Sequence, residues 1–155
     1  MRRLLSSGLI VLAGAASIST QQAAHRDAWK VPASDPRLAI LRTFFQKFDC
    51  PASAYVEEFV TAADAYRLDW RLLPSISFVE STGGKLAPNN NMFGWDNGRA
   101  QFDSPAAAIY RVAYQLAYSD MYRQKSLDKL LTAYNPVGTY AQSVESVMRQ
   151  IAPRQ

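Results

Sequence analysis

Apolar residues recur every three or four positions through most of the chain, which is the spacing of helices that bury one face. The first such pattern follows Asp35-Pro36, where the carboxylate can cap free N–H groups and proline fits the first helical turn. Its apolar stripe consists of Leu38, Leu41, Phe44, Phe45 and Phe48. Cys50-Pro51 interrupts the pattern, so we expect this helix to end before it. A phenylalanine run of this kind indicates core packing rather than a ligand surface.

Two further patterns precede a glycine pair. Val56, Phe59, Val60, Ala63 and Tyr66 mark one helix, and Leu72, Leu73, Ile76 and Val79 mark the next. Asp69 is placed to cap the second of these helices, and Pro74 falls in its first turns, where a missing N–H costs least. Because Gly83-Gly84 follows at once, we expect the helix to end near Glu80-Ser81.

The second half of the chain predicts three more helices. Ser104-Pro105 can open the first as cap and first residue, and Asn135-Pro136 stops the second. Their apolar stripes are Ile109, Val112, Ala113 and Leu116; then Leu127, Leu130, Leu131 and Tyr134; then Tyr140, Val144, Val147, Met148 and Ile151. A tyrosine stripe also repeats every four residues, at Tyr110, Tyr114, Tyr118 and Tyr122. Such a stripe is typical of half-buried packing, although exposed members could widen a binding groove.

Residues 83–103 form one long segment without a helical pattern. Loops of this length in small domains are usually functional or disordered. Met92, Phe93 and Trp95 favour the functional interpretation, because apolar side chains need a packing partner. At most a short β-hairpin fits residues 95–102. The predicted fold is therefore mainly all-α, a small helical globule with one elaborated loop.

The beginning of the chain has a different pattern. An arginine pair precedes an apolar run over residues 4–16, and small residues follow. A basic start, a short apolar centre and a small-residue exit indicate a secretory signal peptide rather than a core helix. We assign residues 1–19 to the signal, 20–35 to a polar N-terminal arm and 36–155 to one domain. We expect a secreted or periplasmic monomer, with no membrane span after removal of the signal.

The composition limits the kinds of catalytic and metal site that the chain can form. The 155 residues include 17 Lys+Arg, 13 Asp+Glu, one His and one Cys, for a net charge of +4. Without the two arginines of the signal the charge is 15 − 13 = +2, too small to indicate nucleic-acid binding. The single Cys50, expected to be buried, excludes a disulfide framework and a multi-Cys zinc site, and one His excludes a His-rich metal site. We expect no metal and no cofactor, so any catalysis must use carboxylates, tyrosines, lysines or backbone groups.

Glu80 is the carboxylate whose position needs an explanation. It closes a strongly apolar helix and lies next to the long loop. A carboxylate beside Phe78 and Val79 is poorly solvated, which raises its pKa, and a carboxyl with a raised pKa can act as a general acid. The alternative is a solvent-exposed residue at a helix end, where its charge is slightly unfavourable against the helix dipole.

The surroundings of Glu80 resemble a known family. Ile76-Ser77-Phe78-Val79-Glu80-Ser81 is followed by Asn90-Asn91-Met92-Phe93-Gly94-Trp95, and then by Tyr134-Asn135-Pro136 and Tyr140-Ala141. This order resembles the mannosyl-glycoprotein endo-β-N-acetylglucosaminidase-like domain, the bacterial peptidoglycan glucosaminidase family of the lysozyme-like superfamily. The resemblance covers about residues 56–151. Each motif alone is weak, but their order and spacing together are more specific.

The resemblance implies a lysozyme-like fold and a role for each matching residue. Glu80 would be the general acid on the glycosidic oxygen. The substrate-binding residues would be Ser81, Asn90, Asn91, Phe93, Gly94, Trp95, Tyr134 and Tyr140. The asparagine amides would bond sugar hydroxyls and N-acetyl groups, and the tyrosines would approach the acid. For Trp95, a sugar-stacking face and a loop anchor packed in the core are equally plausible from the residues.

The chain departs from this family where a second acid is needed. Fuller members carry a longer insertion with a β-hairpin that can supply a second carboxylate. Asp96 is the candidate for the second acid here, although it also suits a turn, and Asp103 could simply help to begin the next helix. A two-carboxylate mechanism needs a pair about 5–5.5 Å apart for retention or about 6.5–9.5 Å apart for inversion.

These observations lead to three hypotheses. The first is an exported glycosidase that cleaves the β-1,4 glycan of peptidoglycan, with peptidoglycan strands as its partner. The second is a lytic transglycosylase that uses Glu80 as both acid and base. The third is a non-catalytic glycan-binding or scaffold domain, since fold does not fix function.

Overall fold

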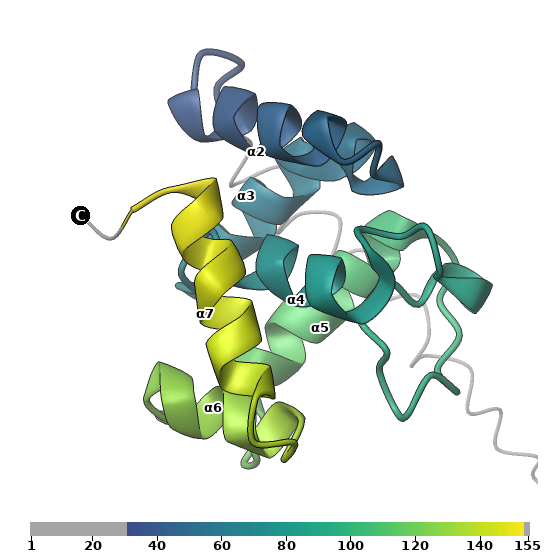
Figure 1. The fold of residues 1–155 in the computed structure, drawn as a ribbon, viewed down its shortest axis with the longest axis vertical. Helices are drawn as coiled ribbons and strands as arrows, with labels where there is room; N and C mark the ends of the chain where they lie inside the picture. The colour runs from purple at the N-terminus through teal and green to yellow at the C-terminus, as the bar shows by residue number, and fades with distance from the viewer. Residues whose placement is uncertain (1–30, 154–155) are drawn as a thin grey trace, which may run out of the picture. The chain divides into compact units, whose positions relative to one another are not determined.

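The computed structural model describes residues 31–153, so the predicted signal peptide and most of the N-terminal arm lie outside the described residues. The described part is helical, which confirms the predicted all-α class (Figure 1). Its α-helices are α2 (Pro36–Lys47), α3 (Val56–Tyr66), α4 (Leu72–Ser81), α5 (Pro105–Tyr118), α6 (Leu127–Tyr134) and α7 (Tyr140–Ile151). Two short 3-10 helices, η1 (Pro51–Tyr55) and η2 (Pro88–Asn90), lie between them.

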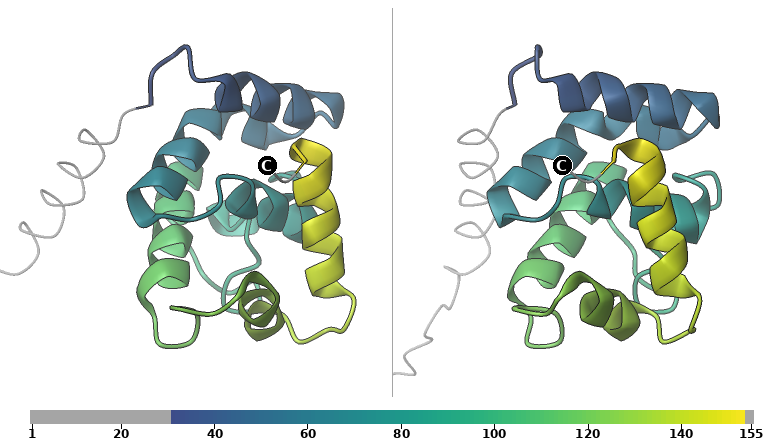
Figure 2. Two further views of the ribbon diagram at one scale, coloured as in Figure 1. Left: turned by 90° about the vertical axis from the view of Figure 1, so that its left-hand side faces the viewer. Right: turned by 60° about the vertical axis from the view of Figure 1, so that its left-hand side comes forward.

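Helix α4 occupies the middle of the domain, with α7 along one side and α3 and α5 along the other (Figures 1 and 2). Helix α2 crosses above them and contacts η1, α3 and α7, while α6 packs against the start of α7 at the opposite end. The most apolar helix is thus the central one, because it must bury several faces at once. This arrangement places the last turn of α4, with Glu80, beside the long loop.

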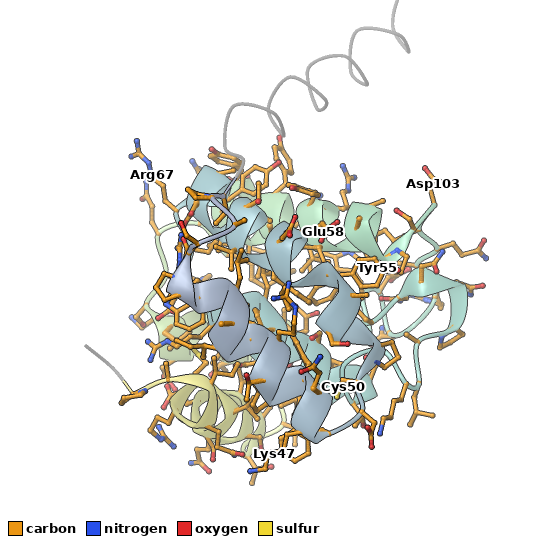
Figure 3. All side chains as sticks on the ribbon, turned by 90° about the horizontal axis from the view of Figure 1, so that it is seen from above. Lys47, Cys50, Tyr55, Glu58, Arg67 and Asp103 are labelled. Atoms are coloured by element: carbon orange, nitrogen blue, oxygen red, sulfur yellow. The ribbon has the colours of Figure 1, made fainter. Side chains whose placement is uncertain are left out.

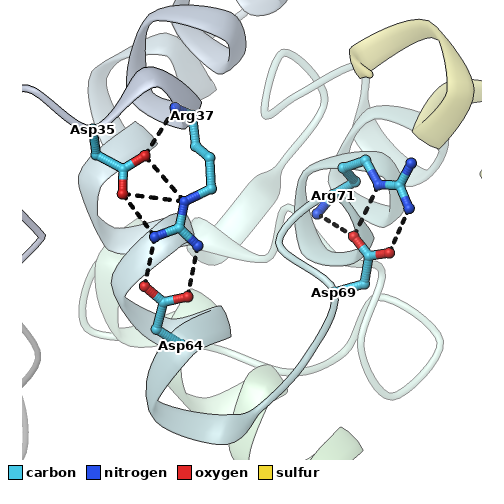
Figure 4. Close-up of polar contacts among 5 residues, drawn as sticks. All are labelled: Asp35, Arg37, Asp64, Asp69 and Arg71. Carbon is cyan, nitrogen blue, oxygen red and sulfur yellow. Dashed lines mark hydrogen bonds and ion pairs between the residues drawn. The ribbon is translucent and has the colours of Figure 1, made fainter. Parts of the chain in front are cut away.

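Helix starts follow the predicted capping residues in two places. The Asp35 carboxylate accepts a hydrogen bond from the N–H of Arg37, and the Ser104 hydroxyl accepts one from Ala107. Helix α4 begins later than Asp69 suggested, at Leu72. The Asp69 carboxylate accepts the N–H of Arg71 and also binds its guanidinium, so it orders the turn before the helix instead of capping it (Figure 4).

The core is built from the predicted stripes. Phe45, Phe59 and Phe93 are among the largest fully buried side chains, and their rings contact one another in sequence. Phe48 is half-buried and packs against Phe44 and Phe78. The free Cys50 is buried, as predicted, beside the turn that joins α2 to η1 (Figure 3).

The long loop differs from the hairpin considered above. Residues 95–99 make consecutive turns, residues 100–102 have no regular structure, and no strand occurs anywhere in residues 31–153. Asn89, Asn90, Asp96 and Asn97 all have left-handed backbone with φ between 52° and 58°. Such residues reverse the chain direction every few positions, so no extended segment is long enough to pair.

Two further results concern the helices. Helix α5 ends at Tyr118, so Tyr122 leaves the tyrosine stripe and lies in a separate turn, where it is buried.

None of the helices in the described part of the chain is both long enough and apolar enough to cross a membrane.

Candidate active site

The last turn of α4 holds Glu80 in place. The helix ends at Ser81; Thr82, which follows it, has left-handed backbone with φ 54°, and Gly83 has φ +61°. A Cβ on Gly83 would come within 2.7 Å of the Cβ of Cys50, so this close approach requires glycine. The end of α4 is thereby fixed against the turn between α2 and η1.

Gly94 lies directly against the Glu80 carboxyl. A Cβ on Gly94 would overlap Oε2 of Glu80 and lie 3.2 Å from its Cδ. Gly94 also has φ +60°, a conformation that other residues adopt only with strain. The loop backbone can therefore approach the carboxyl closely only because this residue is glycine.

Burial shapes the chemistry of Glu80. The side chain is half-buried, and loss of solvation raises the pKa of its carboxyl, while the Tyr140 hydroxyl lowers it by a smaller amount. The Tyr140 hydroxyl is itself buried and has no hydrogen-bond partner among the described residues. A carboxyl with a raised pKa keeps its proton to higher pH, which is what a proton donor needs.

Two tyrosines connect the carboxyl to the C-terminal helices. The rings of Tyr134 and Tyr140 stack with 5.9 Å between centroids and 5° between planes. The Tyr134 hydroxyl donates a 2.6 Å hydrogen bond to the Phe93 carbonyl. Burial raises the pKa of both phenols, so both remain protonated donors. Helix α6 is thus bonded to the loop at Phe93, the residue before Gly94, and α7 is connected to it through the stacked tyrosines.

Four residues predicted to bind substrate serve the scaffold instead. Ser81, Asn91 and Phe93 are buried, and Asn90 is half-buried. The Asn91 amide bonds both the N–H and the carbonyl of Trp95 at 2.9 Å, and the Asn90 amide donates to the Phe102 carbonyl at 2.8 Å. These hydrogen bonds brace the loop, and neither asparagine is among the residues that line the cleft described below.

Ser81 makes the third brace. Its hydroxyl contacts the carbonyls of Ser77 and Met92 at 3.0 and 2.8 Å and accepts the N–H of Gly84 at 2.9 Å. The predicted position of Ser81 in the lining of the site is therefore wrong, because its side chain points into the protein and links α4 to the loop.

An open cleft of about 600 Å³ lies in front of Glu80. Besides Glu80 it is lined by Gly94, Trp95, Asp96, Asn97, Met121, Tyr122, Ala133, Tyr134, Asn135 and Pro136. This volume is within the range of sites that hold a small molecule or a short stretch of polymer. The site residues that the structure brings together here are Glu80, Gly94, Trp95, Asp96 and Tyr134, with Tyr140 buried behind the carboxyl.

Aromatic rings form one wall of this cleft. The Trp95 ring lies 6.0 Å from Tyr122 and 5.7 Å from Tyr134, measured between centroids. Trp95 is half-buried, so it both anchors the loop and presents surface to the cleft. The two interpretations of Trp95 are therefore compatible.

Asp96 lies in the cleft lining, but its environment differs from that of Glu80. Its side chain is 56% exposed and forms a 2.8 Å ion pair with Arg99. Its backbone has φ +53°, as expected for a turn residue. Asp103 is exposed, points outward and does not line the cleft (Figure 3).

Several lining residues were missing from the sequence prediction. Tyr122 is buried in the cleft wall, and Met121 and Pro136 line the cleft beside it. The Tyr134-Asn135-Pro136 motif was a signal for Pro136, whereas Tyr122 was assigned to a helical stripe that ends before it. Within residues 31–153, no group of three or more His, Cys, Asp or Glu side chains is arranged to hold a metal ion.

The chain has no significant match to a protein-family model, to a curated protein or to a solved structure.

Proposed function

We propose that this protein is an exported glycosidase that cleaves the β-1,4 glycan of peptidoglycan, with Glu80 as the general acid. The observation that carries the proposal is the half-buried Glu80 carboxyl, which has a raised pKa and opens onto an aromatic-walled cleft. Protonated Glu80 would donate its proton to the glycosidic oxygen as the bond to C1 breaks, and water would complete hydrolysis.

The choice of substrate has a different basis. The motifs at residues 76–81, 90–95 and 134–141 resemble those of the endo-β-N-acetylglucosaminidase-like family, and the basic, apolar beginning of the chain is typical of export. The half-buried Trp95 ring in the aromatic wall suits pyranose rings, whose faces carry C–H bonds and stack on indole. A secreted or periplasmic enzyme with such a cleft would meet peptidoglycan strands.

The first test is release of soluble material from purified peptidoglycan. We expect Glu80→Gln to lose activity by at least about 100-fold, because general acid catalysis contributes roughly that much. Glu58→Gln is the matched control, since Glu58 is on α3 and outside the cleft lining (Figure 3). Equal activity of Glu80→Gln and wild type would contradict the proposal, and no activity in either would favour a glycan-binding domain.

A second candidate is a lytic transglycosylase. It is favoured by one observation: among the described residues, the acids that line the cleft are Glu80 and Asp96, and Asp96 is ion-paired and exposed. In this route Glu80 would protonate the glycosidic oxygen and then accept the proton of the sugar's own C6 hydroxyl. That oxygen would bond to C1, giving a 1,6-anhydro ring without consuming water.

Isotope labelling separates the two candidates. Digestion in ¹⁸O-water would add one heavy oxygen to each new reducing end in hydrolysis and none to the 1,6-anhydro ends in transglycosylation. Asp96→Asn would strongly reduce activity if Asp96 were a second acid, and would leave it nearly unchanged in the one-carboxylate route.

A further inference from the structure

Three tyrosines gather outside the cleft, on the surface shared by α3 and α5. Tyr66 comes from α3, and Tyr114 and Tyr118 lie one turn apart on α5. The centroid distances are 5.2 Å between Tyr114 and Tyr118, and 6.1 and 6.0 Å from Tyr66 to each of them. Tyr114 and Tyr118 are 46% and 55% exposed, although both are large aromatic side chains.

The ring geometry shows which surfaces of this cluster are open to a ligand. Aromatic rings with centroids 4.5–7 Å apart are in contact with each other, so no space for a cation remains between them. The cluster is therefore not an aromatic cage of the kind that binds quaternary ammonium groups. Tyr66 is half-buried and meets both other rings nearly at right angles, at 84° and 82°. It supports Tyr114 and Tyr118 from α3 and leaves their outer surfaces available.

The cluster is continuous along the chain with the cleft. Helix α5 ends at Tyr118, and Met121, three residues later, lines the cleft and is 59% exposed. Tyr122 follows in the cleft wall. Exposed apolar side chains thus lead from the tyrosine pair to the rim of the site within a few residues.

We propose that the face formed by Tyr114 and Tyr118, here called the tyrosine face, is a second binding surface for a glycan strand, outside the cleft. The proposal rests on the proposed function, which supplies a polymer longer than the cleft. Pyranose rings would stack on the phenol rings, and the exposed Arg111, three residues before Tyr114 on the same side of α5, would meet polar substituents.

A narrow ligand fits this surface better than a protein partner. A stable protein interface usually covers about 800 Å² on each partner with a well-packed apolar centre. The exposed large apolar side chains of α5 are limited to these two tyrosines. Rings already held in position by Tyr66 lose little conformational freedom on binding, which favours a weak but real contact with a linear polymer.

The test is a binding measurement on the full mature protein with Glu80→Gln, which prevents degradation of the ligand. The probes are purified peptidoglycan sacculi and chitin, a β-1,4 glycan without stem peptides. We expect Tyr114→Ala/Tyr118→Ala to weaken binding to both probes by about threefold to tenfold. Tyr118→Phe, which keeps the ring, and Ile40→Ala, an exposed site on α2, should bind like the parent.

Each other result has a defined meaning. Unchanged binding of the double variant to both probes would overturn the proposal, and weaker binding to sacculi alone would assign the face to peptides instead of sugar. Turnover of a soluble peptidoglycan tetrasaccharide by the wild type and by Glu80→Gln tests the proposed function separately. Glu80-dependent turnover with no effect of the tyrosines contradicts only the tyrosine face, and tyrosine-dependent binding without turnover contradicts only the glycosidase.

Discussion

At the scale of single residues, the site depends on one carboxyl and the glycine opposite it. Glu80 is held at the end of an apolar helix, where desolvation raises its pKa. Gly94 allows the loop backbone to close against the carboxyl without steric overlap. The same contact restricts the Glu80 side chain to few orientations, which is a requirement for efficient proton transfer.

Gly94→Ala tests this contact. The new Cβ would overlap the Glu80 carboxyl and would also sit at φ +60°. If the protein cleaves glycan as proposed, we expect activity to fall by about 100-fold, because a displacement of a catalytic group by about 1 Å has that effect. The measurement is the activity of Gly94→Ala and of the wild type on purified peptidoglycan.

Gly98→Ala is the matched control. Gly98 also has positive φ, +79°, but an added Cβ would meet no atom within 4 Å. Gly98→Ala should introduce the same kind of backbone strain as Gly94→Ala, about 1–2 kcal/mol, without displacing Glu80. Equal activities of the two variants would show that strain, and not the contact with the carboxyl, controls the site.

The pH dependence of stability follows from Glu80. Its folded-state pKa is raised, so the folded protein holds this proton more tightly than the unfolded chain. The contribution of Glu80 to the free energy of unfolding is complete below the ordinary carboxyl pKa of 4.5. This contribution is lost as the pH rises through the raised pKa of the folded state. We expect Glu80→Gln to melt at a higher temperature than wild type at pH 7.5 and at nearly the same temperature at pH 3.5. A difference that is independent of pH would contradict the desolvation argument.

At the scale of elements, the site is formed where the end of α4 meets the long loop. The loop has no regular hydrogen-bond ladder, and side chains of Ser81, Asn90 and Asn91 bond its backbone instead. Tyr134 adds a hydrogen bond from α6. The loop is therefore ordered by a few polar side chains that point inward.

This explains what the sequence can predict and what it cannot. Helix positions followed from apolar spacing and from local signals such as Asp35-Pro36, Ser104-Pro105 and Asn135-Pro136, since these act within one turn. The end of α4 at Glu80-Ser81 was predictable for the same reason. The direction of a side chain in an irregular loop depends on distant partners, so the inward orientation of Asn91 could not be read from its neighbours.

Ser81→Ala tests the brace between α4 and the loop. The part-buried N–H of Gly84 and the buried carbonyl of Met92 would lose their partner, and we expect a loss of about 1–3 kcal/mol in unfolding free energy. Ser143→Ala is the control, because the Ser143 hydroxyl also bonds the carbonyl four residues earlier, at 2.9 Å, but is exposed. Urea unfolding measures both, and equal losses would contradict the role assigned to Ser81.

At the scale of the whole described domain, the geometry of the proposed site depends on how α4 and α7 are held together. Glu80 belongs to α4 and Tyr140 to α7, and these helices pack closely along the middle of the domain. Buried Arg71 links their other ends. Its guanidinium donates to the Ala152 carbonyl at 2.8 Å and to the Asp69 carboxylate at 3.0 and 2.6 Å.

Arg71→Lys tests this link. An ammonium cannot reproduce the planar fork, so the bond to Ala152 or to Asp69 should be lost. We expect unfolding free energy to decrease by about 1–2 kcal/mol. Arg149→Lys, which alters an exposed pair at 3.7 Å, should change it by less than about 0.5 kcal/mol. A similar change in both variants, measured by urea unfolding, would show that Arg71 makes no special contribution.

The role proposed for Glu80 is catalysis of the cleavage of a glycosidic bond in peptidoglycan. Mass spectrometry of purified peptidoglycan after incubation with the mature protein, beside Glu80→Gln, tests it most directly. We predict new reducing N-acetylglucosamine ends with the wild type and none with the variant. Reducing N-acetylmuramic ends would mean that the other glycosidic bond is cleaved, and anhydro ends would mean transglycosylation. Either result would keep the role of Glu80 as the acid. Identical products from both proteins, or no product on any wall type, would contradict the claim.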